Sequence, residues 1–257
     1  MMVRSLLFSL FIVFSINISF CHGVELIFDT QDFPPYSYLE NGNVEGPASA
    51  IIRQVCTAMN IKCTLQLQSW TRAQYNVKEG LAHGLFLLAR NKDRDSWLFF
   101  SLPLFKAQYG IFVRQDNPIV FSEPSQLKGY LIGVYGPSNT SRQLELIQKK
   151  IPEILIDLRP NDEAGFRKLF HGRDDAVFSN KDVGLMVCKK MKIKGIRYAG
   201  TYQSTNYHVG FSQKYNDYET VKQFNAAYVK LYKQGTIKQI LQTYDMEPAI
   251  LDESELK

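Results

Sequence analysis

Residues 70–103 read WTRAQYNVKEGLAHGLFLLARNKDRDSWLFFSLP, and this stretch decides the fold. A helical pattern at Thr71–Glu79 ends at a glycine, and a strand pattern follows at Gly84–Ala89. Arg94 then stands in a polar segment before a second apolar run, Trp97–Phe100. Loops between buried strands carry many binding residues. Because a guanidinium matches two carboxylate oxygens at once, Arg94 predicts a small carboxylate-bearing ligand.

The rest of the chain alternates strand and helix patterns, which predicts an α/β fold with largely parallel sheets. The predicted strands are Val24–Asp29, Ile61–Leu67, Gly84–Ala89, Tyr109–Arg114, Leu131–Tyr135, Ile154–Leu158, Ala176–Ser179, Ile196–Ala199 and Asn206–Ser212. The predicted helices are Ser49–Met59, Thr71–Glu79, Asn139–Lys150, Asp162–Phe170, Asp182–Met191, Tyr218–Gln234 and Thr236–Tyr244. A break at Asp116–Pro118 separates two units, so the pattern predicts two α/β lobes.

The N-terminal residues 1–23 predict a secretory signal peptide. Arg4 supplies the positive start, Leu6–Phe14 is apolar apart from one serine, and small residues allow cleavage near residues 21–23. The alternative is an uncleaved membrane anchor, but the apolar run is shorter than the ~20 residues that a spanning helix needs. A bulky phenylalanine before Cys21 argues against lipidation there. We therefore expect an exported, water-soluble protein in the periplasm.

Composition narrows the function classes. The 257 residues carry a net charge of +5 and are 45% hydrophobic, which is ordinary for a globular chain with a sizeable core. The charges are spread along the chain rather than gathered in runs, so we predict no nucleic acid partner. The sequence shows no cluster of cysteine and histidine at ligand spacing, so we predict no metal and no cofactor.

Three cysteines follow the predicted signal peptide. Cys56 and Cys63 lie seven residues apart, across a helix end and a strand start, and export permits oxidation. This spacing favours a disulfide over two free thiols. Cys188 stands in a helix-like run with apolar neighbours and is expected to be a buried apolar residue.

Nine short motifs occur in an order that resembles the bacterial extracellular solute-binding proteins of family 3, the polar amino acid-binding type. They are DFPPY at Asp32–Tyr36, EG at Glu45–Gly46, WTRA at Trp70–Ala73, EGLAHG at Glu79–Gly84, NKDR at Asn91–Arg94, FSLP at Phe100–Pro103, LKGYLIGV at Leu127–Val134, HGRDDA at His171–Ala176 and FNAAYVKLYKQGTI at Phe224–Ile237. The resemblance covers nearly all of the chain after the predicted signal peptide.

This resemblance implies a type II periplasmic-binding-protein fold: two lobes with an interlobe cleft, joined by two crossing hinge strands that close on a solute. The first lobe would comprise residues 24–112 and 207–257, and the second residues 113–206. The hinge would lie near Gly110–Arg114 and Gln203–Val209. The Cys56–Cys63 spacing also matches a disulfide of histidine-binding members.

The resemblance assigns ligand-binding roles in the first lobe. Arg94 matches the arginine that clamps the ligand α-carboxylate; the alternative is an exposed arginine in a surface turn. Phe33 and Trp70 match aromatic walls of the site, although Trp70 could equally be a core tryptophan. Arg72 is either a second cation that binds an acidic side chain of the ligand or part of a solvated helix face. Tyr36 is expected to be a packing residue.

Further candidate ligand contacts lie in both lobes, and two of them, Asn180 and Ala89, depart from the family pattern. Ser138, Asn139 and Thr140 lie at a predicted helix N-terminus, which favours an anion, although Ser138 or Asn139 could simply cap the helix. Asn180 replaces the acidic residue that holds the ligand ammonium, and Ala89 replaces a serine that often contacts it. The ammonium interaction should therefore be weaker, and a carboxylate without a strongly held ammonium is an open alternative.

We therefore expect a monomeric binding protein that captures a small carboxylate-bearing solute, an amino acid or a related organic acid, for ABC-type import through a membrane permease. One alternative is a periplasmic dehydratase-like enzyme on the same fold, whose general acid would come from His83, His171 or His208. Another is a ligand-sensing partner of a separate membrane sensor. The first hypothesis predicts a non-enzyme.

Overall fold

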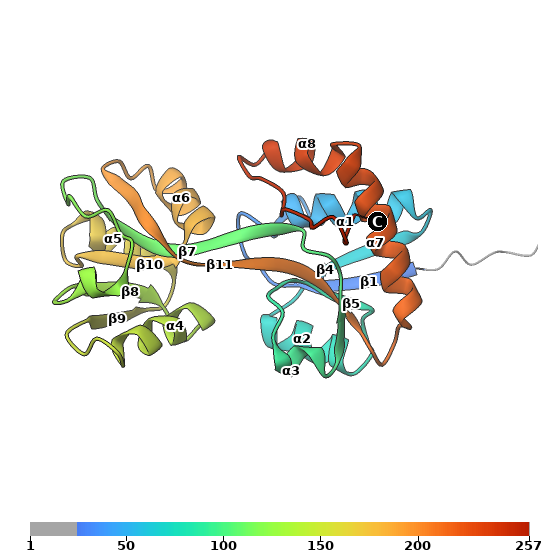
Figure 1. The fold of residues 1–257 in the computed structure, drawn as a ribbon, viewed down its shortest axis with the longest axis horizontal. Helices are drawn as coiled ribbons and strands as arrows, with labels where there is room; N and C mark the ends of the chain where they lie inside the picture. The colour runs from blue at the N-terminus through green and yellow to red at the C-terminus, as the bar shows by residue number, and fades with distance from the viewer. Residues whose placement is uncertain (1–24, 257) are drawn as a thin grey trace, which may run out of the picture.

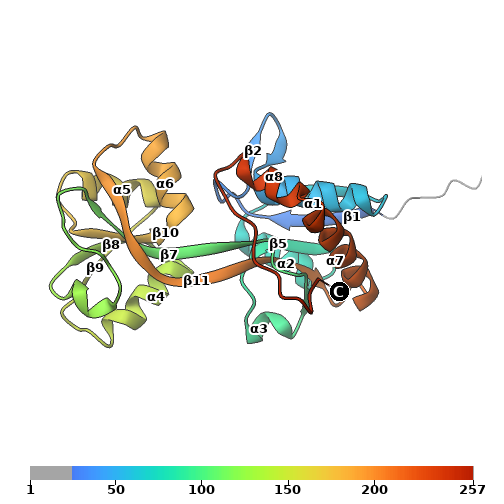
Figure 2. The ribbon, with the colours of Figure 1, turned by 45° about the horizontal axis from the view of Figure 1, so that its top comes forward.

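Two α/β lobes make up the computed structural model, which describes residues 25–256 (Figure 1). Two long strands, β7 (Phe105–Arg114) and β11 (Ile196–Ser212), run from one lobe to the other. They pair antiparallel along their length, from Ile196 opposite Arg114 to Tyr207 opposite Phe105. A view turned by 45° shows the same two strands side by side between the lobes (Figure 2).

The first lobe holds the strand order β4-β1-β5-β11, and β6 pairs with the end of β11. Its strands are β1 (Glu25–Thr30), β4 (Lys62–Leu67), β5 (Gly84–Leu88) and β6 (Leu98–Phe100), beside a hairpin of β2 (Tyr38–Glu40) and β3 (Asn43–Glu45). Its helices are α1 (Pro47–Ala58), α2 (Trp70–Lys78), α3 (Lys92–Asp95), α7 (Tyr218–Lys233) and α8 (Thr236–Gln242). The C-terminal helices α7 and α8 contact α1, so the chain returns to its first lobe.

The second lobe continues the sheet from β7 in the order β10-β8-β9. Its own strands are β8 (Leu131–Tyr135), β9 (Leu155–Arg159) and β10 (Ala176–Asn180). Its helices are α4 (Asn139–Gln148), α5 (Asp162–Phe170) and α6 (Lys181–Lys190), after a 3-10 turn, η1 (Pro124–Leu127). β8 pairs in parallel with both β9 and β10, as expected where helices connect the strands.

Each lobe is held by its own aromatic contacts. In the first lobe, Phe28 meets Phe211 edge to face, with ring centres 5.5 Å apart, so β1 packs against the end of β11. In the second lobe, Phe112 of β7 meets Phe166 of α5 in the same way at 5.0 Å. All four side chains are buried, and such pairs add about 0.5–1.5 kcal/mol beyond their buried area.

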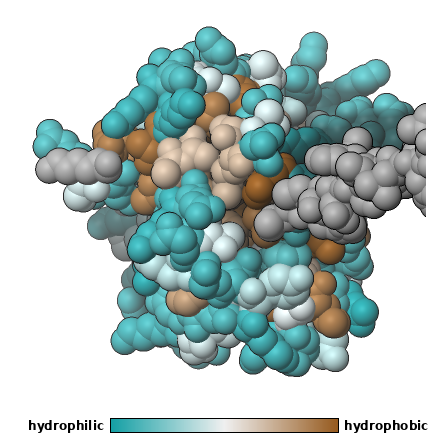
Figure 3. Space-filling view, turned by 90° about the vertical axis from the view of Figure 1, so that its right-hand side faces the viewer, coloured by the Kyte–Doolittle hydropathy of each residue, from teal (hydrophilic) through white to brown (hydrophobic). Residues whose placement is uncertain are grey.

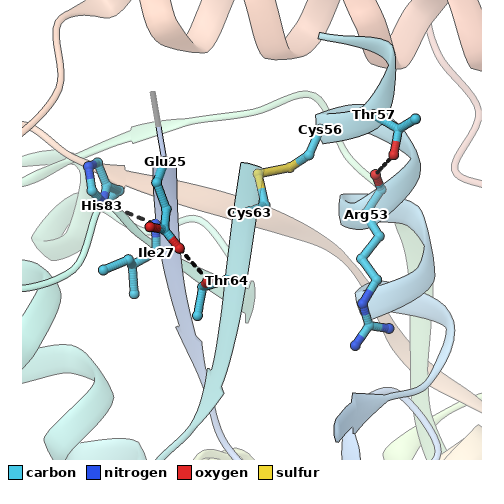
Figure 4. Close-up of a disulfide and its surroundings, with 8 residues drawn as sticks. All are labelled: Glu25, Ile27, Arg53, Cys56, Thr57, Cys63, Thr64 and His83. Carbon is cyan, nitrogen blue, oxygen red and sulfur yellow. Dashed lines mark hydrogen bonds between the residues drawn. A yellow bond between two sulfur atoms is a disulfide. The ribbon is translucent and has the colours of Figure 1, made fainter. Parts of the chain in front are cut away.

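A disulfide joins Cys56 of α1 to Cys63 of β4, and this confirms the predicted pairing (Figure 4). On the neighbouring strand, the Ile27 N–H donates to Nδ1 of His83 at 3.0 Å. Cys188 of α6 is half-buried rather than buried, because Val183, Gly184 and Val187 form the buried face of this helix and Cys188 packs beside them against the core. Burial raises the pKa of the Cys188 thiol to about 11.

Most predicted elements occur within a few residues of their expected bounds, but β11 differs. The predicted strands Ile196–Ala199 and Asn206–Ser212 are one continuous strand, because residues 200–205 also pair with β7. These residues are mostly half-exposed and their register shifts twice, so they lack the apolar alternation that marks a strand.

The predicted lobe boundaries at 112/113 and 206/207 stay a prediction, since both fall inside the strands that run through both lobes. The predicted signal peptide, residues 1–23, lies outside the described residues. Within residues 25–256, no helix combines the length and the apolar character that a membrane crossing requires.

Candidate functional site

Arg94 lies on the one-turn helix α3, not on an irregular loop as predicted. Asn91 begins this helix, because its side-chain oxygen accepts the Arg94 N–H at 2.9 Å. The guanidinium Nη1 donates to the carbonyl oxygen of Ala89 at 2.7 Å, and its carbon lies 5.6 Å from the centre of the Trp70 ring. The structure therefore brings together Arg94, Ala89 and Trp70.

The Arg94 charge has no carboxylate partner among the described residues. Its side chain is half-buried, and burial lowers the pKa of the guanidinium, while Asp93 and Tyr207 act in the opposite direction. The neighbouring Arg90, by contrast, forms an ion pair with Asp95 at 2.7 Å. A partly desolvated cation gains most from a partner that satisfies its remaining N–H groups, and a carboxylate does so with two hydrogen bonds.

The backbone that leads to Arg94 is strained. Leu87 of β5 has a φ of 68°, in the left-handed region that a residue with a Cβ adopts at a cost of roughly 1–2 kcal/mol. The pairing of β5 with β11 shifts register opposite this point, between His208 and Val209. Bulges of this kind bend a strand and redirect the residues after it. Ala89, whose carbonyl holds Arg94, follows directly after this irregularity.

Trp70 and Arg72 both lie on α2 but have different surroundings. Ser69 caps this helix, and Trp70 packs partly against the apolar cluster that includes Ala73 while it also faces Arg94. Trp70 therefore packs in the core and also lies beside Arg94, and its contact with a ligand stays a prediction. The Arg72 guanidinium lies 5.6 Å from the ring of Tyr75 on the exposed side of the helix, which favours the interpretation as a solvated helix face.

An aromatic group lies where Phe105 of β7 pairs with Tyr207 of β11. The Phe33 ring lies 5.2 Å from the Tyr36 ring and 6.2 Å from the Tyr207 ring, and Tyr36 stacks on Phe105 at 5.3 Å. Sequence reasoning predicted Phe33 but missed Tyr207, which is buried and bonds through its hydroxyl to the hydroxyl of Tyr109. No local signal marks these two tyrosines, because they meet across paired strands 98 residues apart.

Tyr36 links the lobes through its hydroxyl. The ring is fully buried, as predicted for a packing residue. Its hydroxyl also lies 2.9 Å from Oδ1 of Asn180 and donates to Oδ2 of Asp182 at 2.7 Å, and both partners belong to the second lobe. Burial and the nearby Asp182 charge raise the pKa of the Tyr36 hydroxyl well above its usual value, so it remains a donor.

Asn180 ends β10 and caps α6. Its Oδ1 accepts the N–H groups of Asp182 and Val183 at 2.9 and 3.2 Å. Its Nδ2 is buried and has no acceptor among residues 25–256. The oxygen that was expected to accept a ligand ammonium is therefore already used by the protein itself.

The predicted anion contacts of the second lobe lie at the N-terminus of α4. Ser138 caps this helix: its hydroxyl oxygen accepts the Ser141 N–H at 3.0 Å and its O–H donates to Tyr135. The capping alternative is thus correct for Ser138. Asn139 and Thr140 open the first turn, where backbone N–H groups have no partner within a helix. Because these N–H groups and the helix dipole favour anions, the two residues remain predicted ligand contacts.

The histidines that were candidates for acid chemistry have structural partners. His83 Nδ1 accepts the Ile27 N–H, and His208 Nδ1 lies 2.9 Å from the Ser101 carbonyl oxygen. Burial lowers the pKa of both imidazoles. His171 is exposed at the C-terminus of α5. These surroundings give no support to a catalytic general acid.

A hollow of about 920 Å³ lies apart from these residues, along α7 and the C-terminal tail. Leu102, Ala226, Val229 and Leu256 line it together with several lysines. The outer end of the first lobe carries a patch of apolar side chains within a hydrophilic surface (Figure 3). The hollow includes none of the predicted site residues, so it does not locate the ligand.

Comparison with known proteins agrees with the two-lobe fold. The profile of the bacterial extracellular solute-binding proteins, family 3, matches residues 26–247. A histidine kinase sensor domain with similarity to periplasmic binding proteins superposes with a TM-score of 0.72 at 19% identity, over 88% of this chain and 99% of that one. Comparison with curated protein sequences gave no match.

Two further solved structures are similar. An ancestral arginine-binding protein bound to arginine gives a TM-score of 0.70 at 22% identity, over 86% of this chain and 97% of that one. The arginine-, lysine-, histidine-binding protein ArtJ from Geobacillus stearothermophilus gives 0.67 at 20% identity, over 88% and 97%. These likenesses confirm the predicted two-lobe periplasmic-binding-protein fold. Together with the profile match, they show that the chain belongs to the bacterial extracellular solute-binding proteins of family 3.

Proposed function

We propose that this protein captures a small carboxylate-bearing solute in the periplasm and delivers it to an ABC-type membrane importer. The solute is an amino acid or a related organic acid, held between the two lobes without chemical conversion. The family supports the binding role, and solved relatives include proteins bound to arginine and to glutamine.

One observation carries the proposal: the half-buried Arg94 guanidinium has no carboxylate partner among the described residues. Its single side-chain hydrogen bond, to Ala89, fixes the guanidinium plane beside Trp70 and leaves further N–H groups for a ligand. Phe33 supplies an aromatic wall near the same junction. We propose that Asn139 and Thr140 contact the carboxylate from the second lobe when the lobes close, whereas Arg72 contributes only solubility.

Binding is tested by a thermal-shift screen of amino acids and small organic acids, followed by calorimetry of each hit. A ligand at a hundredfold excess over its dissociation constant stabilises the protein by about 2.7 kcal/mol. Arg94→Ala should abolish that shift. The control is Arg90→Ala, since Arg90 already pairs with Asp95 and should leave binding within about twofold.

The proposal is contradicted if no carboxylate in the screen stabilises the protein. It is also contradicted if the hits bind the Arg94→Ala variant with the wild-type affinity. NMR spectra of a bound solute after prolonged incubation should show no product, and conversion would favour an enzyme. Uptake of the identified solute by cells with and without the gene tests the transport role.

A further inference from the structure

Helix α7 and the C-terminal tail line a second concave surface of the first lobe, which we name the α7 hollow. Both segments lie on the side of this lobe that faces away from the second lobe (Figure 1). The hollow has a volume of about 920 Å³, and one face of α7 from Lys222 to Gln234 lines it. Ligand sites in proteins commonly measure about 300–1,000 Å³ and are mostly apolar. The α7 hollow therefore has the size of a small-molecule site.

The protein itself holds the walls of this hollow in place. On one side, the Leu102 N–H donates to Oδ1 of Asn225 at 2.9 Å, which fixes the loop after β6 against α7. On the other side, the tail forms a turn, because the Asp252 carbonyl oxygen accepts the Leu256 N–H at 3.1 Å. Leu251, just before this turn, is buried in the core of the first lobe. A ligand would therefore meet a surface that needs little ordering, which favours binding.

The floor of the α7 hollow is apolar. The side chains of Leu102, Val229 and Leu256 are half-buried and pack against the core of the first lobe. Ala226, one turn before Val229, is exposed in the same lining. Burial of such apolar surface is favourable, because it removes that surface from water. The floor therefore favours a hydrocarbon chain over a polar group.

The rim of the hollow carries an excess of positive charge. Lys222, Lys230 and Lys233 line it, against a single carboxylate, that of Glu255. The Lys222 ammonium already lies 3.3 Å from the carboxylate of Glu219. Lys230 and Lys233 lie one turn apart on α7 and form no ion pair within residues 25–256. Two neighbouring ammonium groups at one end of an apolar floor favour a ligand with an anionic head and a hydrocarbon tail.

We propose that the α7 hollow binds a single-chain anionic amphiphile, namely a long-chain carboxylate. Its carboxylate lies against Lys230 and Lys233, and its alkyl chain covers the apolar floor. Because the hollow has walls on both sides, it fits one chain better than the flat surface of a membrane. This site shares no residue with the carboxylate site proposed at Arg94, so the two sites bind their ligands independently.

Calorimetry on the purified protein tests this site with sodium decanoate, kept below its micelle concentration. We expect one decanoate per protein. Octanoate, which lacks two methylene groups, should bind about tenfold more weakly. Decyltrimethylammonium, which has the same tail length and a positive head, should bind at least about fivefold more weakly. The inference is wrong if decanoate does not bind, or if the anionic and cationic amphiphiles bind equally well.

Two variants place the ligand within the hollow. Lys230→Gln combined with Lys233→Gln should weaken decanoate binding about fivefold, the effect of two exposed ion pairs. Ala226→Glu, at an exposed position, should abolish binding, because it places a carboxylate over the apolar floor. The matched control is Lys189→Gln combined with Lys192→Gln, two exposed lysines at the same spacing at the end of α6. The control should bind decanoate as the wild-type protein does, and unchanged binding by both hollow variants would overturn the inference.

Two further measurements distinguish this site from other sources of binding. Arg94→Ala should bind decanoate within about twofold of the wild-type affinity, because distant sites act independently. Loss of decanoate binding in Arg94→Ala would overturn the inference and leave the proposed function intact. Vesicles of phosphatidylglycerol and phosphatidylcholine should not retain the protein in flotation experiments. Retention that depends on Lys230 and Lys233, without decanoate binding, would assign the hollow to a membrane surface and overturn the inference.

Discussion

The Tyr36 hydroxyl of the first lobe donates a 2.7 Å hydrogen bond to the Asp182 carboxylate of the second lobe. Tyr36 is fully buried against Phe105 of β7, so the bond ties a rigid ring to the first turn of α6. This contact joins the lobes beside the crossing strands. The protein's own side chains form it, one from each lobe.

Tyr36→Phe removes this bond and keeps the ring. Because a hydrogen bond to a charged group contributes about 1.5–3 kcal/mol, the free energy of unfolding should fall by about 2 kcal/mol in urea titrations. Small-angle scattering should show a wider spread of lobe arrangements. Tyr38→Phe, at a half-buried tyrosine that begins β2, is the control and should change neither measurement. Equal stability of the wild-type and Tyr36→Phe proteins would show that the contact does not tie the lobes.

The Cys56–Cys63 disulfide closes a short loop between α1 and β4. The loop-closure estimate for about eight residues is about 2.5 kcal/mol at 25 °C. Replacing both cysteines by serine should lower the free energy of unfolding by that amount, as should a reducing agent added to the wild-type protein. Cys188→Ser is the matched control and should remain sensitive to the reducing agent. A wild-type protein that unfolds at the same urea concentration with and without reductant would contradict this prediction.

His83 makes the stability of the first lobe depend on pH. Burial lowers the pKa of this imidazole below its usual value of about 6.5, and its Nδ1 must be unprotonated to accept the Ile27 N–H. The unfolded chain therefore binds a proton at a pH where the folded chain does not. The stability that unprotonated His83 contributes is complete above about pH 6.5 and is lost as the pH falls below that value.

The measurement is the difference in unfolding free energy between pH 7.5 and pH 5.0. His83→Gln should show a smaller loss on acidification than the wild-type protein. His171→Gln, at an exposed helix end, should show the wild-type loss. An unchanged loss in His83→Gln would assign the acid sensitivity to other groups, such as His208, whose pKa burial also lowers.

The crossing strands approach each other closely at Gly110 and Gly200. A Cβ at Gly110 would clash with the Gly200 carbonyl oxygen and with the Tyr198 hydroxyl. Gly110→Ala should therefore destabilise the protein by about 2 kcal/mol, as overpacking does elsewhere. Gly165→Ala in α5, where a Cβ would lie 3.7 Å from Val177, is the control and should be neutral or stabilising by up to about 1 kcal/mol. Thermal unfolding of both variants measures these two effects. A Gly110→Ala protein as stable as the wild type would contradict the predicted clash.

The fold was largely predictable, because apolar residues recur along its helices and strands at the spacing typical of each element. Leu131–Tyr135 and Asp162–Phe170 have the predicted bounds. The middle of β11 was not predictable, since residues 200–205 are held by pairing with a strand ninety residues away and show no alternation of their own. The short helix α3 had a local signal in its Asn91 cap, although the polar composition of this segment predicted a loop.

The candidate site was predictable only in part. Arg94 and Phe33 stand in motifs that are contiguous in sequence, so their positions were recognisable. Tyr207 and Asp182 were missed, because Tyr207 meets Tyr109 across paired strands and Asp182 meets Tyr36 across the lobes. The chemistry expected of Asn180 also needed the structure, since only the hydrogen bonds of its oxygen show which end of the amide is available.

The return of β11 to the first lobe has a consequence for how the chain matures. Leu85 of β5 pairs with Gly210, so the sheet of the first lobe cannot be completed until the whole second lobe has emerged. The second lobe, by contrast, is built mostly from contiguous residues and can form early. Since long loops close slowly, a chain exported from its N-terminus would hold an unfinished strand edge at β5 throughout translocation. The first segment to cross the membrane would be the last to finish folding.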